Sequence, residues 1–234
     1  LAAGTSHVCS IEKGSRKAVC WGWDTWGQVS KVPADERFIM IVGGAHHTCG
    51  LKDDQSAVCW GRKEAPAMLA PGHERFRALT AGYWHTCGLR AIDSTAVCWG
   101  NDANGQMTVP KSAEGVPFAS LVASSAQTCG LREDGSAICW GLDPQATPPV
   151  DERFSSISAG EYHTCGVRKV DSAGVCWGLN HYGQSDVPAN ERFNYIVAGG
   201  DHSCGLRKDG TVACWGLNGD GQASPPEDQH FRSL

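Results

Sequence analysis

Twelve cysteines are the residues whose chemistry is clearest in this sequence. They form six pairs, ten or eleven residues apart, around turn-forming segments such as Lys208-Asp-Gly210. Directly opposed residues of an antiparallel hairpin bring their Cα atoms about 4.5–5.5 Å apart, which a disulfide spans. Zinc is the alternative, but zinc sites favour pairs about two to four residues apart. We therefore predict six disulfides, each within one hairpin: Cys9–Cys20, Cys49–Cys59, Cys87–Cys98, Cys129–Cys139, Cys165–Cys176 and Cys204–Cys214.

These disulfides also indicate a compartment. Closing each loop would add about 2.8 kcal/mol of stability if the effect is purely chain entropy. Disulfides persist in oxidising surroundings, so we expect a secreted protein, extracellular or periplasmic. The sequence starts at Leu1 and shows no signal peptide or transmembrane run, so we expect that a leader was removed or not included. It has no Asn-x-Ser/Thr site for N-glycosylation.

Histidine is the second candidate for chemistry. Five histidines occupy one equivalent position, and their alternative roles are metal binding or catalysis: His7, His47, His85, His163 and His202. In a ring of repeats they would stand far apart, and Gln127 at the same position cannot replace a catalytic base. We therefore predict that they bond to a loop backbone. Two Asp/Asn-rich loops at 102–105 and 218–221 lack the bidentate Glu of calcium sites. No catalytic residue, metal site or cofactor is predicted.

These residues belong to a repeat that fills the chain. Each copy approximates L-x-A-G-x-x-H-T-C-G-L-R-x-D-G-x-A-V-C-W-G-x-N-x-x-G-Q-x-x-V-P-x-x-E-R-F, and the copies span 1–40, 41–78, 79–120, 121–156, 157–195 and 196–234. Short β-rich runs bounded by Gly, Pro, Asn and Asp predict four strands per copy. The last, Q-x-x-V-P, has a proline that suits an edge. We predict an all-β fold: a six-bladed β-propeller of four-stranded blades, one hairpin disulfide per blade, as a single domain over 1–234.

The chain ends predict how such a ring closes. Phe231-Arg-Ser-Leu234 joined to Leu1-Ala-Ala-Gly resembles the internal Phe76-Arg-Ala-Leu79-Thr-Ala-Gly, although Leu234 and Leu1 occupy the same repeat position. The first copy lacks its own first strand. We therefore expect residues 231–234 to complete the first blade. The alternative is a seventh blade outside this sequence.

The motif A-G-x-x-H-T-C-G-L, then D-G, then C-W-G-x-N-x-x-G-Q resembles the regulator of chromosome condensation repeat, whose members are β-propellers. The paired cysteines make the chain more similar to the crinkly-type ectodomains of plant receptor kinases and to secreted bacterial relatives. A secreted β-lactamase inhibitor propeller shares the repeat without the cysteines. The family includes a nucleotide exchange factor, a light sensor, receptor ectodomains and an enzyme inhibitor, so the resemblance implies fold more than function. Two departures are six copies where relatives usually have seven, and Ser124 and Gln127 in the fourth copy.

Most repeated side chains are interpreted as scaffold. Tryptophan and the preceding cysteine of C-W-G point to opposite faces of their strand, so these tryptophans should pack between blades: Trp21, Trp60, Trp99, Trp140, Trp177 and Trp215. The glutamines of Gly-Gln should tie their loop to a neighbour, and the arginines before each Phe should form inter-blade ion pairs or stack on aromatic rings. These residues are Gln28, Gln106, Gln184 and Gln222, and Arg37, Arg75, Arg153 and Arg192.

Large residues outside the consensus gather on two kinds of loop. Strand directions place the loop between the first and second strands, and the loop after the third, on one face, here called the upper face. Aromatic residues outside a core are typical of binding hot spots; the alternative is that they cover the blade ends. In the inhibitor propeller, the resemblance implies that these loops bind. We predict a partner-binding surface of Trp23, Asp24, Trp26, His46, Tyr83, Trp84, Glu161, Tyr162, His181, Tyr182 and Asp201.

Function is predicted from this surface and from what is missing. The sequence has no G-x-S-x-G, H-E-x-x-H or P-loop motif. Its net charge is -5 and it has no Lys/Arg cluster, so we expect no nucleic-acid partner and no membrane insertion. We predict a non-enzymatic module that binds a protein, inhibitor-like or receptor-ectodomain-like. The alternative is a lectin binding a glycan, although a repeat lectin would carry the same residues in every blade; an enzyme site at the channel mouth is the weaker alternative.

Overall fold

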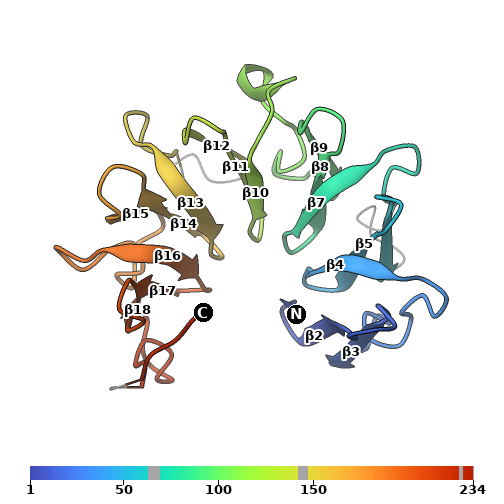
Figure 1. Cartoon of the computed structure of the whole chain (residues 1–234), viewed down its shortest axis with the longest axis horizontal. Coiled ribbons are helices and arrows are strands. Elements are labelled where there is room, and N and C mark those ends of the chain that lie inside the picture. The colour runs from blue at the N-terminus through green and yellow to red at the C-terminus, as the bar shows by residue number, and fades with distance from the viewer. Residues whose placement is uncertain (63–68, 142–146, 227–228, 234) are drawn as a thin grey trace. The chain divides into compact units, whose positions relative to one another are not determined.

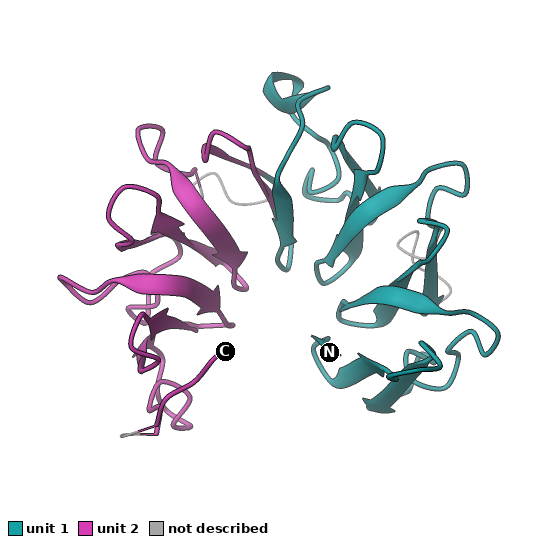
Figure 2. Ribbon diagram, in the orientation of Figure 1, with its two compact units in different colours: residues 1–128, 140–142 teal, residues 129–139, 143–234 magenta. Residues whose placement is uncertain are grey.

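The computed structural model, drawn in Figure 1, describes residues 1–62, 69–141, 147–226 and 229–233. These fall into two compact units, shown in Figure 2: unit 1 is residues 1–128 with 140–142, and unit 2 is residues 129–139 with 143–234. Leu234, the end of the segment expected to close a ring, lies outside the described residues. Ring closure and the single-domain organisation stay predictions.

The described residues form eighteen strands in six three-stranded sheets, with one short 3-10 turn, η2 (Lys111–Ala113). Each sheet takes three strands in chain order. They are β1 (Ala2–Ala3), β2 (His7–Ile11), β3 (Ala18–Gly22); β4 (Phe38–Gly43), β5 (His47–Lys52), β6 (Ala57–Gly61); β7 (Phe76–Ala81), β8 (His85–Arg90), β9 (Ala96–Gly100); β10 (Ser120–Ala123), β11 (Gln127–Leu131), β12 (Ala137–Gly141); β13 (Phe154–Ala159), β14 (His163–Arg168), β15 (Gly174–Gly178); and β16 (Phe193–Ala198), β17 (His202–Arg207), β18 (Val212–Gly216).

The all-β class and the six repeated sheets are confirmed, but the prediction of four strands per sheet is wrong. The Q-x-x-V-P segment forms turns instead of a strand. In the first repeat, the Gln28 carbonyl accepts hydrogen bonds from Thr48 Oγ1 at 3.3 Å and from Trp60 Nε1 at 3.0 Å. That carbonyl therefore binds side chains of the second sheet. The proline that follows has no N–H to add to a ladder.

The hairpin disulfides are confirmed. In the third sheet, for example, Cys87 of β8 stands opposite Cys98 of β9. All six predicted pairs are bonded, with Cα atoms 4.0–4.1 Å apart. The Asp-Gly-type turns therefore set the register that brings the sulfurs together.

The hydrophobic core lies between successive sheets of each unit. In unit 1, Cys49 and Leu51 of β5 pack with Phe76, Leu79 and Trp99 of the next sheet. Unit 2 repeats this arrangement between β14 and the sheet that contains Trp215. Five C-W-G tryptophans are 3–7% exposed, as inter-sheet packing requires, whereas Trp21 is 49% exposed. Trp21 belongs to the first described sheet, whereas Trp60 packs with Cys9 of the sheet before its own.

Histidines join successive sheets. Nε2 lies 2.7–2.9 Å from a hydroxyl of the following repeat in the pairs His7–Thr48, His47–Thr86, His85–Thr128 and His163–Ser203. The hydroxyl of Thr128 donates to the Gln106 carbonyl at 3.0 Å, so it accepts from His85. The histidines are thus structural, but their partner is a neighbouring hydroxyl rather than the predicted loop backbone. Burial lowers the pKa of His47, His85 and His163 to about 4.

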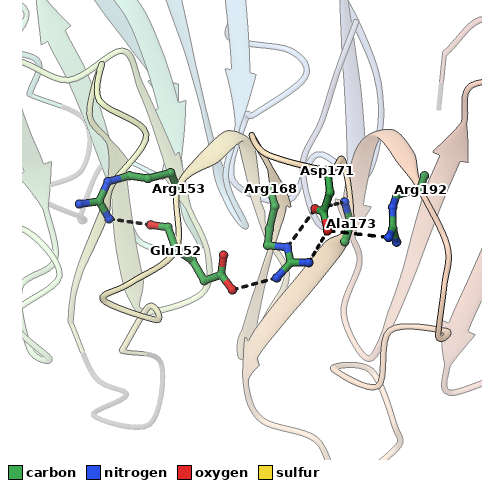
Figure 3. A network of polar contacts seen from close by, with 6 residues as sticks. All are labelled: Glu152, Arg153, Arg168, Asp171, Ala173 and Arg192. Atoms are coloured by element: carbon green, nitrogen blue, oxygen red, sulfur yellow. Dashed lines mark hydrogen bonds and ion pairs between the residues drawn. The ribbon is translucent and has the colours of Figure 1, made fainter.

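Ion pairs hold the linker before the first strand of a sheet. They lie at the ends of the strands opposite to the upper-face loops. Figure 3 shows Arg168 of β14 between Glu152 of the preceding linker, at 3.1 Å, and Asp171 of the turn. Arg90–Glu74 at 2.7 Å and Arg207–Glu191 at 2.6 Å repeat this linker pair. The arginines before Phe contribute less than predicted. Arg153 donates to its own linker carbonyls and lies 4.0 Å from Asp134, and Arg192 lies 3.8 Å from Asp171.

Candidate binding site

In five repeats of the described chain, one backbone hydrogen bond joins the two upper-face loops. The residue after C-W-G donates its N–H to the residue before the histidine: Trp23 to Ser6 at 2.8 Å, Arg62 to His46 at 3.0 Å, and Asn101 to Trp84 at 2.9 Å. The last residue of C-W-G, directly before the donor of this bond, has to be a glycine. Gly61 has φ +119, and a Cβ there would stand 2.5 Å from the His46 carbonyl oxygen. The residues at these two positions are therefore neighbours in every described repeat of this kind.

Three successive repeats of unit 1 bring five large side chains together, here called the aromatic cluster. The first repeat supplies Trp23 and Trp26, the second His46 and Arg62, and the third Trp84. The His46 ring lies at the centre, with centroid distances of 5.3 Å to Trp23, 6.0 Å to Trp26 and 4.8 Å to Trp84. The contacts to Trp23 and Trp84 are edge-to-face, an arrangement that aromatic rings favour.

Arg62 adds a positive charge to the rings. Its guanidinium carbon lies 4.5 Å from the Trp26 ring centroid and 5.5 Å from that of Trp84. Such cation–π contacts are worth about 0.5–1 kcal/mol at exposed sites and about 2 kcal/mol when desolvated. The pKa of His46 is lowered, chiefly by burial and further by Arg62, so His46 is neutral at physiological pH. Arg62 therefore carries the formal charge of the cluster.

Three buried polar atoms of the cluster lack a hydrogen-bond partner among the described residues. They are Nε1 of Trp26, Nδ1 of His46 and Nε of Arg62. The first and last are donors only. Atoms of the same kind also lack a partner in the scaffold, such as Nε1 of Trp99 and Nδ1 of His85, so this feature is shared with the core and does not by itself mark a ligand site.

Two other predicted residues of unit 1 lie beside the cluster in different roles. Asp24 Oδ1 accepts the backbone N–H groups of Val29 at 2.7 Å and Ser30 at 2.9 Å. The pKa of Asp24 is lowered, first by hydrogen bonding from the Ser30 side chain and then by the backbone groups of Ser30 and Val29. Asp24 thus shapes the loop that carries Trp26. Tyr83 is held by its backbone, whose N–H donates to Ser124 and whose carbonyl accepts from Ala45.

The remaining predicted residues belong to unit 2. Tyr162 is 42% exposed and Tyr182 54% exposed, and His181 is also exposed. The backbone N–H of Glu161 donates to Gly199 at 3.1 Å, and the Asp201 carbonyl accepts from Leu217 at 2.8 Å. These side chains lie on the loops where the strand directions place them. Their membership of a binding surface stays a prediction.

Arg62 was missed by the sequence analysis. It occupies the repeat position of Trp23, directly after C-W-G, where later repeats have Asn101, Leu179 and Leu217. Searching the loops for aromatic residues passed over this cation. Comparing all six residues at that one position would have found it, because Arg62 is the only charged residue there.

In the described part of the chain, no group of three His, Cys, Asp or Glu side chains is placed to hold a metal ion. Among the same residues, no helix has the length and apolar character needed to cross a membrane.

Comparison with known proteins identifies the repeat. The sequence model of the regulator of chromosome condensation (RCC1) repeat matches residues 76–106 and 194–222. Prp20p of Saccharomyces cerevisiae, described with its binding properties to Gsp1p and histones, superposes with a TM-score of 0.75 over 98% of this chain and 74% of its own, at 15% identity. That likeness concerns the fold alone.

Two receptor ectodomains are more similar in sequence. The ectodomain of the Physcomitrella patens receptor kinase CR4 is 28% identical, with a TM-score of 0.82 over 99% of this chain and 66% of its own. The CRINKLY WD40 ectodomain of the Arabidopsis thaliana receptor kinase ACR4 is 30% identical, with a TM-score of 0.75 over 92% of this chain and 80% of its own. With its six disulfides and its matched repeats, the chain belongs to the RCC1 repeat family and resembles the CRINKLY-type ectodomains within it.

Proposed function

We propose that this chain is an extracellular, non-enzymatic module that binds a protein partner through the aromatic cluster. The observation that carries the proposal is the convergence of Trp23, Trp26, His46, Arg62 and Trp84 from three repeats on the upper loops of unit 1. Trp and Arg are the residue types most enriched in interface hot spots. The charge of Arg62, which forms no ion pair among the described residues, is poorly suited to a purely structural cap.

The comparisons support the same class of function. Both of the more similar structures are ectodomains of receptor kinases, and the matched part is the ectodomain. The disulfides agree with an oxidising, extracellular location. The lectin alternative has no comparable support, because the cluster combines unlike residues from three repeats instead of one repeated set.

The test begins with the partner. The purified chain is crosslinked in the extracellular fluid of its source, the captured protein is purified, and its affinity is measured by calorimetry. Trp23→Ala and Trp84→Ala should each weaken binding at least about thirtyfold, since hot-spot truncations cost about 2 kcal/mol or more. Arg37→Ala is the matched control, because Arg37 is an exposed residue of a unit 1 linker at the opposite ends of the strands.

Two results would overturn the proposal. One is full affinity in Trp23→Ala and Trp84→Ala with loss of affinity in Arg37→Ala, which would move the site to the linker side. The other is cluster-dependent binding of glycans on an array without a protein partner. Thermal unfolding of each variant shows whether it remains folded.

A further inference from the structure

Resting on the proposed function, we infer that the cluster recognises an acidic peptide segment and that Arg62 binds its carboxylate. Arg62 lies against two of the tryptophans of the cluster. Its guanidinium carbon lies 4.5 Å from the Trp26 ring centroid and 5.5 Å from that of Trp84, so the two indoles contact and orient it. A guanidinium held by aromatic contacts keeps its N–H groups directed outward in its own plane.

Arg62 has no anionic partner among the described residues. Among the described residues it forms no ion pair and its side chain makes no hydrogen bond. The residue is only partly buried, and Nε is the one nitrogen of its side chain found buried and unsatisfied. Its terminal nitrogens therefore have no hydrogen-bond or ion-pair partner among the described residues. By contrast, Arg90 at the end of β8 is paired with Glu74 of its linker at 2.7 Å.

The chemistry of Arg62 determines the ligand that it can bind. A guanidinium is cationic and can only donate hydrogen bonds, so the ligand has to supply acceptors. A carboxylate does so with two oxygens and pairs with the two-pronged guanidinium. The Trp26 loop itself holds one acid, Asp24, and one base, Lys31, which offset each other.

A carboxylate suits this cluster better than a phosphate. A phosphate monoester carries about −1.5 to −2 charges and is usually bound by several cations, whereas this cluster holds one cation and a neutral His46. Three indole rings surround the site and provide apolar surface for the residues that flank the acid. One carboxylate within a partly apolar peptide fits this combination.

The test uses random short peptides displayed on phage, selected on the immobilised full chain and counter-selected on Trp84→Ala. Selected sequences should be enriched in Asp or Glu next to apolar residues. Synthetic versions should lose at least about tenfold in affinity when their Glu is replaced by Gln, and Arg62→Gln should lose the same factor. In Arg62→Gln, the Glu and Gln peptides should then bind equally, because the pair has already been broken.

Arg62→Lys separates charge from geometry: it should recover only part of the affinity, because lysine lacks the planar fork. Cluster-dependent peptides that bind equally with Glu or Gln would overturn this inference and leave the proposed function intact. A selection that yields no cluster-dependent peptide, or a preference for phosphorylated over acidic peptides, would also overturn it. The proposed function is tested separately: it fails if the protein partner binds Trp23→Ala and Trp84→Ala with unchanged affinity.

Discussion

Nε2 of His85 lies 2.8 Å from Oγ1 of Thr128, one repeat further along the chain, and His85 is fully buried. The same contact is found between three other pairs of successive repeats. At each of these junctions, a histidine therefore helps to hold two neighbouring sheets together. Because the Thr128 hydroxyl donates its hydrogen bond to the Gln106 carbonyl, only the neutral imidazole with Nε2–H satisfies the geometry without adding a buried charge.

Stability should therefore fall in mild acid. Burial lowers the folded-state pKa of His47, His85 and His163 from 6.5 to about 4. The unfolded chain then binds more protons between these values, so stability is full above pH 6.5 and falls towards pH 4. Each histidine removes up to about 1.4 kcal/mol per pH unit in this window. Thermal unfolding from pH 7.5 to 4 measures the slope.

The fourth repeat provides a matched control for this prediction. Gln127 stands naturally at the histidine position and is buried. His85→Gln should keep a donor for Thr128 while removing one titrating group, so its stability should depend less on pH. A wild-type unfolding temperature that stays constant from pH 6.5 to 4.5 would contradict the role given to these histidines.

Two tryptophans of the same repeat position should respond differently to truncation. Trp99 is 5% exposed and packs with Phe76 and Leu79, whereas Trp21 is 49% exposed. Trp99→Ala should destabilise the fold by about 3–5 kcal/mol, as large deletions in a core do. Trp21→Ala should cost less than about 1.5 kcal/mol, since only part of its apolar surface is buried. Urea unfolding of both variants tests this difference, and equal losses would refute it.

The glycine of T-C-G-L should tolerate no side chain where a phenylalanine covers it. A Cβ on Gly88 would stand 2.4 Å from Cδ1 of Phe76. Gly88→Ala should therefore destabilise the protein by about 1–3 kcal/mol through overpacking. The first sheet has Ser10 at this position, beside the two-residue β1 (Ala2–Ala3), so Ser10→Gly should change the unfolding free energy by less than about 1 kcal/mol. An unaffected Gly88→Ala would show that the ring moves aside at little cost.

The parts of the structure that follow from short-range spacing were predictable from sequence. Cys87 and Cys98 flank one turn, so the hairpin alone determines their pairing. The absence of a fourth strand was not predictable, because it depends on which groups donate hydrogen bonds to the Gln28 carbonyl. That group bonds to Thr48 and Trp60 of another repeat, which a propensity for strands does not reveal.

The candidate site was predictable as a set of loops but not as a cluster. Strand direction placed Trp23, Trp26, His46 and Trp84 on equivalent loops. Their meeting around His46 depends on side-chain conformations in three repeats. Arg62 was missed because a cation in a polar loop normally points into solvent. Here it lies against two indoles instead.

Two exposed tyrosines of unit 2 test how far the binding surface extends. Tyr162 and Tyr182 are 42% and 54% exposed on the corresponding loops of unit 2. If they contact the same partner as the aromatic cluster, Tyr182→Ala should weaken binding without lowering the unfolding temperature. Tyr is a frequent hot-spot residue, and a loss of about 2 kcal/mol corresponds to about thirtyfold in affinity. The combination with Trp23→Ala should add the two losses, because the side chains belong to different units and share no partner in the described structure.

Ile92→Ala is the control, since this apolar side chain is 91% exposed on a turn at the ends of the strands opposite to the upper-face loops. Normal binding by Tyr162→Ala and Tyr182→Ala, with loss in Trp23→Ala, would restrict the surface to the cluster in unit 1.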